Sequence, residues 1–364
     1  MKNFLTLLFS LLCCIIAGAQ VTATSPPNDN AFNSVSYRPL PPLQVNGTQG
    51  VSAPFAGNIG NSLLVAGGCN FPNVPAAQGG TKYFYADIYE LSHIDAPHQR
   101  WHKIGQLPTP LAYGVSVSVP HGIVCIGGTP DGKRSSASVY LLHTDRHHKL
   151  LVDTLPPLPL PLDNMAGAYG GGYIYVAGGQ SNGHAVNAAF RLRYPRGTAW
   201  ERLPDFPGSA RVQPAAAVQH NATTSCFYLF GGFSPIENTR PAVAHTDGWC
   251  YNPVVHQWVK MANIVPHGRT QAITLSGSFG IASGCAHIVF VGGVNKERFE
   301  RAVNMPLLIA QAERACKQQG THAAQATLAQ LQAEQAAYMR HPAPWYEFND
   351  ELVIYHTITD TWVT

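Results

Sequence analysis

A short apolar run that ends in two glycines recurs along this chain, and this recurrence restricts the fold more than any other feature. The five glycine pairs are Gly67-Gly68, Gly127-Gly128, Gly178-Gly179, Gly231-Gly232 and Gly292-Gly293. Each pair closes a run with the composition of a β-strand, and successive pairs are roughly 50 to 60 residues apart. Strand-bearing repeats of this size predict an all-β propeller, in which each repeat forms one blade.

The repeats also share an aromatic outer strand. Each unit holds the apolar strand with its glycine pair, a variable loop, a second strand and the outer strand. Tryptophans mark four of these outer strands: Trp101, Trp200, Trp258 and Trp362. We expect the indoles to pack between neighbouring blades rather than to stack on a ligand. The combined pattern is that of a kelch-type β-propeller over residues 37–364, with five recognisable blades.

The two ends of the predicted propeller do not match. Residues 37–41 resemble an outer strand that has no inner strands before it. In a closed ring such an orphan strand pairs with strands from the C-terminus, which removes the exposed sheet edge. No inner strands follow Thr364, and a sixth blade needs about 40 more residues. The sequence therefore predicts an incomplete sixth blade.

One insertion interrupts the last blade. Between Asn304 and Met339 the chain is rich in Ala, Gln and Leu, with a break at Gly320. This composition predicts two short helices over about 305–339, outside the sheet as a cap.

The N-terminus has the features of an export signal. Met1-Lys2-Asn3 is followed by an apolar run from Phe4 to Ala17 and by the small residues of a cleavage site. We expect a signal peptide over residues 1–19, a flexible lead-in over 20–36, and a periplasmic or secreted protein. The apolar run is too short to span a membrane comfortably, so no membrane partner is expected after cleavage.

Composition excludes one class of partner and leaves the cysteines open. Charged residues make up 12% of the chain and the net charge is +3, so nothing resembles the basic surface that binds nucleic acid. After signal cleavage six cysteines remain, and either buried free thiols or at least one disulfide fits their positions. They are Cys69, Cys125, Cys226, Cys250, Cys285 and Cys316.

Three asparagines are candidate ligand contacts. Asn70 and Asn295 follow the first and fifth glycine pairs, and Asn164 lies in the turn before the third. Loops beyond the inner strands meet at one mouth of a propeller channel, where small polar ligands bind. An asparagine in such a place can equally bond the backbone of its own turn. Both interpretations stay open.

Two arginines lie in equivalent turns of later blades. The planar fork of Arg211 or Arg269 would suit the carboxylate of an acidic sugar. The alternative is an arginine that bonds carbonyl groups of the adjacent blade. No metal-ligand spacing, Ser-His-Asp order or phosphate-binding loop is present, so neither a metal nor a cofactor is predicted.

Four segments carry a resemblance to a known family. They are Gly67-Gly68-Cys69-Asn70-Phe71-Pro72, Ala112-Tyr113-Gly114-Val115-Ser116, Gly292-Gly293-Val294-Asn295-Lys296 and Tyr355-His356-Thr357-Ile358-Thr359-Asp360-Thr361-Trp362. Together they resemble the N-acetylneuraminate epimerase, or sialic acid mutarotase, kelch family. Their order is similar to that of the cyclically permuted mutarotase group, in which the blade with the Asn-Phe-Pro loop comes first.

The resemblance implies a substrate and a chemistry. Members are exported six-bladed proteins that interconvert the anomers of free sialic acid, which needs a base, an acid and a cation for the substrate carboxylate. No metal or organic cofactor is implied. Transferred by motif, Asn70, Asn164, Arg211, Arg269 and Asn295 would line the channel mouth, with Arg211 as the carboxylate contact.

Two departures limit the transfer. The glutamate and arginine proposed as catalytic in the family lie in a Gly-Glu-x-Lys-Pro-Gly-x-Arg-Thr segment of the blade after the Asp-Thr-Trp strand, and this sequence ends before such a blade. Leu111 stands where relatives can have arginine, and Glu297 and Glu300 are expected to face solvent. The catalytic residues are therefore unassigned. A non-catalytic kelch module that binds carbohydrate or protein is the alternative.

Overall fold

The computed structural model describes residues 38–45, 48–96 and 98–363. The compact unit begins at Pro41. The predicted signal peptide, 1–19, and lead-in, 20–36, lie outside the described residues.

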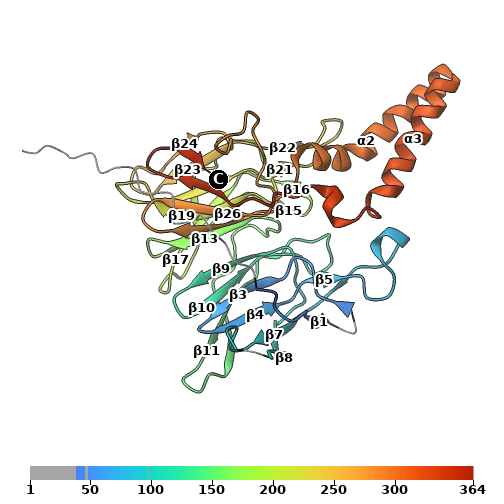
Figure 1. Cartoon of the computed structure of the whole chain (residues 1–364). Coiled ribbons are helices and arrows are strands. Elements are labelled where there is room, and N and C mark those ends of the chain that lie inside the picture. The colour runs from blue at the N-terminus through green and yellow to red at the C-terminus, as the bar shows by residue number, and fades with distance from the viewer. Residues whose placement is uncertain (1–37, 46–47, 97, 364) are drawn as a thin grey trace, which may run out of the picture. The chain divides into compact units, whose positions relative to one another are not determined.

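Five four-stranded antiparallel sheets make up most of the unit, and in each sheet neighbouring strands follow chain order (Figure 1). The first three sheets are β3 (Phe55–Ile59), β4 (Ser62–Ala66), β7 (Asp87–Leu91) and β8 (Trp101–Gln106); β9 (Val115–Val119), β10 (Gly122–Ile126), β11 (Val139–Thr144) and β12 (Leu150–Thr154); β13 (Ala166–Gly170), β14 (Tyr173–Ala177), β17 (Ala189–Arg193) and β18 (Glu201–Leu203). The last two are β19 (Ala215–His220), β20 (Ser225–Phe230), β23 (Gly248–Asn252) and β24 (Gln257–Met261); β25 (Phe279–Ser283), β26 (His287–Val291), β27 (Val353–His356) and β28 (Thr361–Val363).

Short hairpins and helices occupy the connections. The hairpin strands are β1 (Gln44–Val45) with β2 (Thr48–Gln49), β5 (Cys69–Asn70) with β6 (Tyr83–Phe84), β15 (Gln180–Ser181) with β16 (His184–Ala185), and β21 (Phe233–Ser234) with β22 (Val243–Ala244). The helices are η2 (Ala76–Gln78), α2 (Lys296–Gln319), α3 (His322–Tyr338) and η3 (Ala343–Tyr346). None of the helices in the described part of the chain has both the length and the apolar character of a membrane span.

Each sheet packs against the next one along the chain. Four apolar clusters lie between the five sheets, one for each consecutive pair. Strand β14 contributes to the clusters on both faces of its sheet. Ile174 and Val176 belong to the cluster shared with the second sheet, whereas Tyr175 and Ala177 belong to the cluster shared with the fourth. Because side chains alternate between the faces of a strand, a sheet buried on both faces requires the continuous apolar runs seen in the sequence.

The fifth sheet keeps one apolar face in solvent. Gly280 lies close to the backbone of Ala216 in the fourth sheet, so the alternate positions on β25 point away from that neighbour. Phe279 and Ile281 are 60% and 50% exposed there, and Val291 opposite Phe279 is 44% exposed.

The tryptophans bond the preceding sheet, in agreement with the expectation of a structural role. The indole N–H of Trp200 donates to the carbonyl oxygen of Pro156 at 2.8 Å, and that of Trp258 donates to Pro204 at 2.7 Å. Both acceptors lie just after the outer strand of the sheet before. Since indoles withdrawn from water need an acceptor, this contact links the outer strands of neighbouring sheets.

The predicted orphan strand is not formed in the described residues of 37–41. Residues 38–43 are irregular, although the Pro41 carbonyl accepts the Trp101 indole at 2.8 Å, as Pro156 and Pro204 do for later tryptophans. Pro39 and Pro41 have no backbone N–H to donate to a neighbouring strand, which is the physical reason for the difference.

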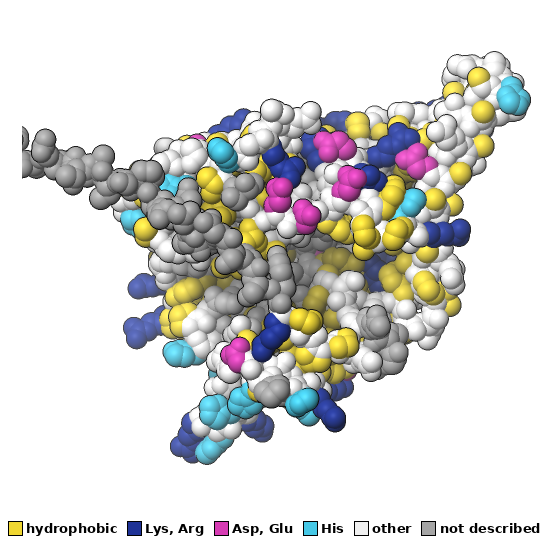
Figure 2. Space-filling view, in the orientation of Figure 1, with side chains coloured by type: hydrophobic (Ala, Val, Ile, Leu, Met, Phe, Trp, Pro, Cys, Tyr) yellow, Lys and Arg dark blue, Asp and Glu magenta, His cyan; other side chains and the backbone are white. Residues whose placement is uncertain are grey.

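The helical insertion begins earlier than predicted. Helix α2 starts at Lys296, not near 305, because Asn295 caps it: its side chain accepts the N–H of Arg298 at 3.0 Å. The break at Gly320 is confirmed, since this glycine ends α2 with φ of 62°. Figure 1 shows α2 and α3 side by side and extending away from the strands. Acidic and basic side chains alternate near the base of these helices (Figure 2).

All six cysteines among the described residues are free thiols. Cys69, Cys125, Cys226 and Cys250 are buried, as the thiol alternative predicts, while Cys285 is exposed. No disulfide joins any two of them within the described ranges.

Candidate functional site

A row of left-handed residues connects the starts of the five sheets. Ala53, Tyr113, Asn164, Gln213 and Gly277 have φ values of 50°, 61°, 54°, 52° and 72°. Each lies two residues before the first strand of its sheet. We call these five residues the αL row.

Backbone hydrogen bonds run along the αL row from one sheet to the next. The N–H of Tyr113 donates to the carbonyl of Ala53 at 3.0 Å, and the N–H of Asn164 donates to Tyr113 at 2.7 Å. Gln213 donates to Asn164 at 2.7 Å, and Gly277 to Gln213 at 3.2 Å. A left-handed conformation costs a residue with a side chain about 1–2 kcal/mol, and these bonds offset that cost. Strain of this kind concentrates at functional sites.

Three members of the αL row carry polar side chains. The Asn164 amide donates to Asp163 at 2.6 Å and accepts from Gln213 at 3.3 Å, while the Tyr113 hydroxyl accepts from Lys82 at 2.8 Å. Asp163 is almost fully buried, and Ser135 and Gln180 also donate to its carboxylate.

Burial is the main influence on the Tyr113 phenol. It raises the pKa of Tyr113 above its usual value, although the bond from Lys82 acts in the opposite direction. The phenol is therefore a hydrogen-bond donor at neutral pH. The αL row thus presents a phenol and two amides from three consecutive sheets.

Asn70 is held by its surroundings. Its amide nitrogen donates to the Gly50 carbonyl at 2.9 Å, and its oxygen accepts the Tyr85 hydroxyl at 2.7 Å. The asparagine is half-buried in the hairpin that also carries Lys82. This hairpin, which connects β4 to β7 of the first sheet, thus contributes both Asn70 and the Lys82 of the contact with Tyr113, and both polar groups of Asn70 have partners in the protein.

Arg211 is 1% exposed, and its guanidinium makes four hydrogen bonds within the protein. Its guanidinium donates to both oxygens of Asp247, at 2.5 and 3.1 Å, and to the carbonyl groups of Gly231 and Ser209. Burial alone would raise the pKa of Asp247, but the bonds from Arg211 and Trp249 hold it below its usual value. This geometry favours the alternative in which an arginine bonds the adjacent sheet, rather than a contact with a substrate carboxylate.

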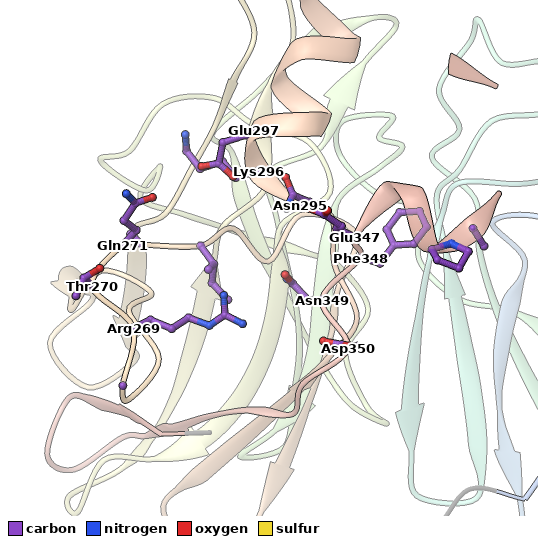
Figure 3. Close-up of a pocket in the computed structure, with 15 residues that line it drawn as sticks. Arg269, Thr270, Gln271, Asn295, Lys296, Glu297, Glu347, Phe348, Asn349 and Asp350 are labelled. Carbon is purple, nitrogen blue, oxygen red and sulfur yellow. Dashed lines mark hydrogen bonds between the residues drawn. The ribbon is translucent and has the colours of Figure 1, made fainter. Parts of the chain in front are cut away.

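Arg269 and Asn295 line a separate cavity of about 840 Å³ beside the fifth sheet (Figure 3). Arg269 extends toward Asn349 and Asp350 in this view, and its guanidinium pairs with Glu351 at 2.8 Å. The other lining residues include Thr270, Gln271, Lys296, Glu297, Glu347 and Phe348.

Asn295 acts mainly as a helix cap in this cavity. Its oxygen accepts the Arg298 N–H, and its amide lies 3.4 Å from Glu347. Of the five predicted site residues, Arg269 and Asn295 share this cavity.

Two acidic residues were expected to flank a loop and face solvent. Both lie on the first turns of α2, where Glu300 accepts the backbone N–H of Ala244 at 2.8 Å and pairs with Lys296 at 3.0 Å. The expectation is wrong for Glu300, which fastens α2 to β22 because the helix starts at residue 296. Glu297 lines the 840 Å³ cavity.

The model of a protein family described as N-acetylneuraminate epimerase matches residues 20–152 and 155–364. The chain belongs to the N-acetylneuraminate epimerase family. The resemblance predicted from the four sequence segments is thereby confirmed.

Similar curated proteins carry the same family name. The N-acetylneuraminate epimerase of Salmonella typhi is 28% identical over 210 residues, 57% of this chain and 47% of the relative. That of Brucella suis is 34% identical over 122 residues, 32% of this chain and 31% of the relative. The matched part thus spans about half the length of the Salmonella typhi protein and about a third of the Brucella suis protein.

A solved structure supports the fold of this epimerase family member. The structure of YjhT superimposes with a TM-score of 0.54 at 13% identity, covering 68% of this chain and 78% of that one. This likeness and the five four-stranded sheets confirm the predicted kelch-type β-propeller. The sheets are its blades.

Sequence reasoning missed three residues that the epimerase fold brings together: Lys82, Tyr113 and Gln213. The signal for two of them was present, since Tyr113 and Gln213 occupy the same position before their blades as Asn164 does. Lys82 had no comparable signal, because its contact with Tyr113 joins loops of two different blades.

Proposed function

We propose that this protein binds free N-acetylneuraminate at the αL row and interconverts its α and β anomers. The family match over residues 20–152 and 155–364 is the observation that carries this proposal. The polar side chains of Tyr113, Asn164 and Gln213, one from each of three consecutive blades, support it, because converging polar groups orient a sugar.

The reaction opens and recloses the sugar ring. A base removes the proton of the anomeric hydroxyl, the bond from the anomeric carbon to the ring oxygen breaks, and an acid protonates that oxygen. Reclosure on the other face of the resulting ketone gives the second anomer. The Tyr113 phenol can donate a hydrogen bond to a sugar oxygen throughout, since its raised pKa keeps it protonated. The residues that move the two protons are unassigned.

We also propose export to the periplasm or the cell exterior. The charged start, apolar run and small-residue cleavage site of residues 1–19 support this. Replacing Ala17 and Ala19 with bulky residues should retain a longer chain in the producing cells, and unchanged processing would contradict the proposal.

Anomer exchange can be measured directly by NMR after a single pure anomer is dissolved in buffer. We expect substoichiometric protein to bring the two anomers to equilibrium faster than buffer at the same pH, and heat-unfolded protein to have no effect. A rate equal to that of buffer would contradict the catalytic part of the proposal. Calorimetric binding without acceleration would favour a non-catalytic carbohydrate-binding module.

The position of the site has its own test. Asn164→Gly removes the amide but retains a residue that adopts positive φ without strain, so the backbone bonds of the αL row persist. We expect N-acetylneuraminate to bind about 3- to 10-fold more weakly, the usual worth of one neutral hydrogen bond. Asn238→Gly makes the same substitution at an exposed residue with φ of 56° outside the αL row and should bind as wild type. Equal affinity in both variants would place the sugar elsewhere.

A further inference from the structure

Lys82 lies where two blades meet at the αL row. It precedes β6 in the loop of the first blade, and its ammonium group donates to the Tyr113 hydroxyl of the second blade at 2.8 Å. The same nitrogen lies over the aromatic rings of Tyr113 and Phe71, 5.0 and 5.6 Å from their centres. The lysine is half-buried.

Among the described residues, five lysine and arginine side chains are buried or half-buried: Lys82, Arg191, Arg211, Lys296 and Arg298. Four of them have a carboxylate partner within 3.0 Å. The pairs are Arg191–Glu201, Arg211–Asp247, Lys296–Glu300 and Arg298–Glu347. Lys82 alone in this group has no carboxylate within ion-pair distance in the described part of the chain.

An ammonium group in this position favours an incoming anion. Partial burial removes part of the hydration of the charge, and two aromatic faces with one phenol replace only some of it. A carboxylate that binds there supplies the missing opposite charge. Charges withdrawn from water are otherwise paired in folded proteins, as the other four side chains show.

The neighbouring groups suit an acidic sugar. Tyr113 connects Lys82 to Asn164, because its hydroxyl accepts from the lysine and its backbone carbonyl accepts the Asn164 N–H at 2.7 Å. A ligand whose carboxylate meets Lys82 therefore has the polar side chains of the αL row beside it. Arg211 is not placed for the same task, since it is 1% exposed and its guanidinium already donates to Asp247 and to two carbonyl groups.

We propose that Lys82 binds the carboxylate of the acidic sugar and so positions it on the αL row. This inference rests on the proposed function. It assigns the cation that anomerisation of an acidic sugar requires to a residue of the first blade. Tyr113 orients the ammonium group through its hydroxyl.

The test compares a carboxylate with its neutral ester by calorimetry. Wild type, Lys82→Met, Lys82→Arg and Lys149→Met would each be titrated with N-acetylneuraminate and with its methyl ester. Lys149 is an exposed lysine with no ion-pair partner among the described residues, so its variant is the matched control. Melting curves would establish that all four proteins are folded.

We expect Lys82→Met to bind N-acetylneuraminate about 10- to 100-fold more weakly, the range for a hydrogen bond to a charged group. Its affinity for the ester should stay within about twofold of wild type, because the ester has no charge to lose. Lys82→Arg should recover part of the affinity for the acid, and Lys149→Met should match wild type.

The outcomes separate this inference from the proposed function. Two outcomes overturn the role of Lys82 and leave the proposed function standing, provided that wild type binds the acid. In the first, Lys82→Met binds the acid as tightly as wild type does. In the second, its affinities for the acid and for the ester fall by the same factor. If folded wild type binds neither ligand, both are overturned.

Discussion

The carboxylate of Asp247 holds both terminal nitrogens of the Arg211 guanidinium, at 2.5 and 3.1 Å. Arg211 belongs to the turn before the fourth blade and Asp247 precedes a middle strand of that blade. The pair therefore fastens the entry of the blade to its centre. Such an ion pair, with one partner completely buried, is a structural element whose loss exposes an uncompensated charge.

We expect Arg211→Met to lower the free energy of unfolding by about 3–5 kcal/mol, because Asp247 then remains partly buried without its counter-charge. Denaturant titration would measure this. The double variant Arg211→Met/Asp247→Leu should recover part of the loss, since it leaves no unpaired charge. A single variant as stable as wild type would contradict the structural role.

Gly67 and Gly292 are the first residues of equivalent glycine pairs, but only Gly67 of the two lies against the following blade. A Cβ on Gly67 would lie 2.3 Å from the Leu111 carbonyl oxygen of the next blade, whereas a Cβ on Gly292 would meet nothing within 4 Å. Both have positive φ, 65° and 73°. We expect Gly292→Ala to cost about 1–2 kcal/mol from the backbone alone, and Gly67→Ala to cost at least twice as much. Similar losses in both variants would show that the approach of the second blade contributes nothing.

Phe55 and Phe279 begin the first strands of the first and fifth blades and differ in burial, 1% against 60% exposed. Phe55→Ala should cost about 3–5 kcal/mol, because it opens a cavity between two blades. Phe279→Ala should cost less than about 1 kcal/mol and should reduce self-association, since an exposed apolar face promotes contacts between molecules. Thermal melting and light scattering would measure the two effects. A large stability loss at Phe279 would mean that this face is covered in solution.

His245 makes stability depend on pH. Burial first, and then the charge of Arg211, lower its pKa to about 4, against opposing effects of Asp247 and Glu300. The ring nitrogen lies 2.7 Å from the Ser234 hydroxyl. The unfolded chain binds a proton on this imidazole near pH 6.5, and the folded chain does not. The contribution of the neutral imidazole to the free energy of unfolding is therefore complete above pH 6.5 and is lost as the pH falls toward 4.

The expected loss between pH 7 and pH 4.5 is of the order of 2 kcal/mol. Urea unfolding of wild type and His245→Gln at both pH values would isolate it, since glutamine retains a hydrogen-bonding group for Ser234 but does not titrate. The stability of wild type relative to His245→Gln should therefore fall by about 2 kcal/mol at the lower pH. A difference that does not change would mean that His245 is protonated in the native state.

Much of the architecture was predictable from local patterns. The five glycine pairs, the apolar runs before them and the tryptophans of the outer strands each reflect a requirement that every blade repeats, so the blades and their order could be read directly. The family resemblance rested on short contiguous segments in the same way. The orphan strand and the start of α2 were misjudged because each depends on one local detail, the prolines at 39 and 41 and the cap at Asn295.

The amino-acid sequence alone determined the repeat, the apolar strands and the set of polar residues that are candidates for the site. Only the tertiary structure decided which candidates are free to act: it paired Arg211 with Asp247, made Asn295 a helix cap, and placed Lys82 beside Tyr113 with no carboxylate partner among the residues that the structure describes. The physical reason is that the burial and pairing of a charge depend on atoms brought together from different blades. Spacing along the sequence contains no record of these contacts.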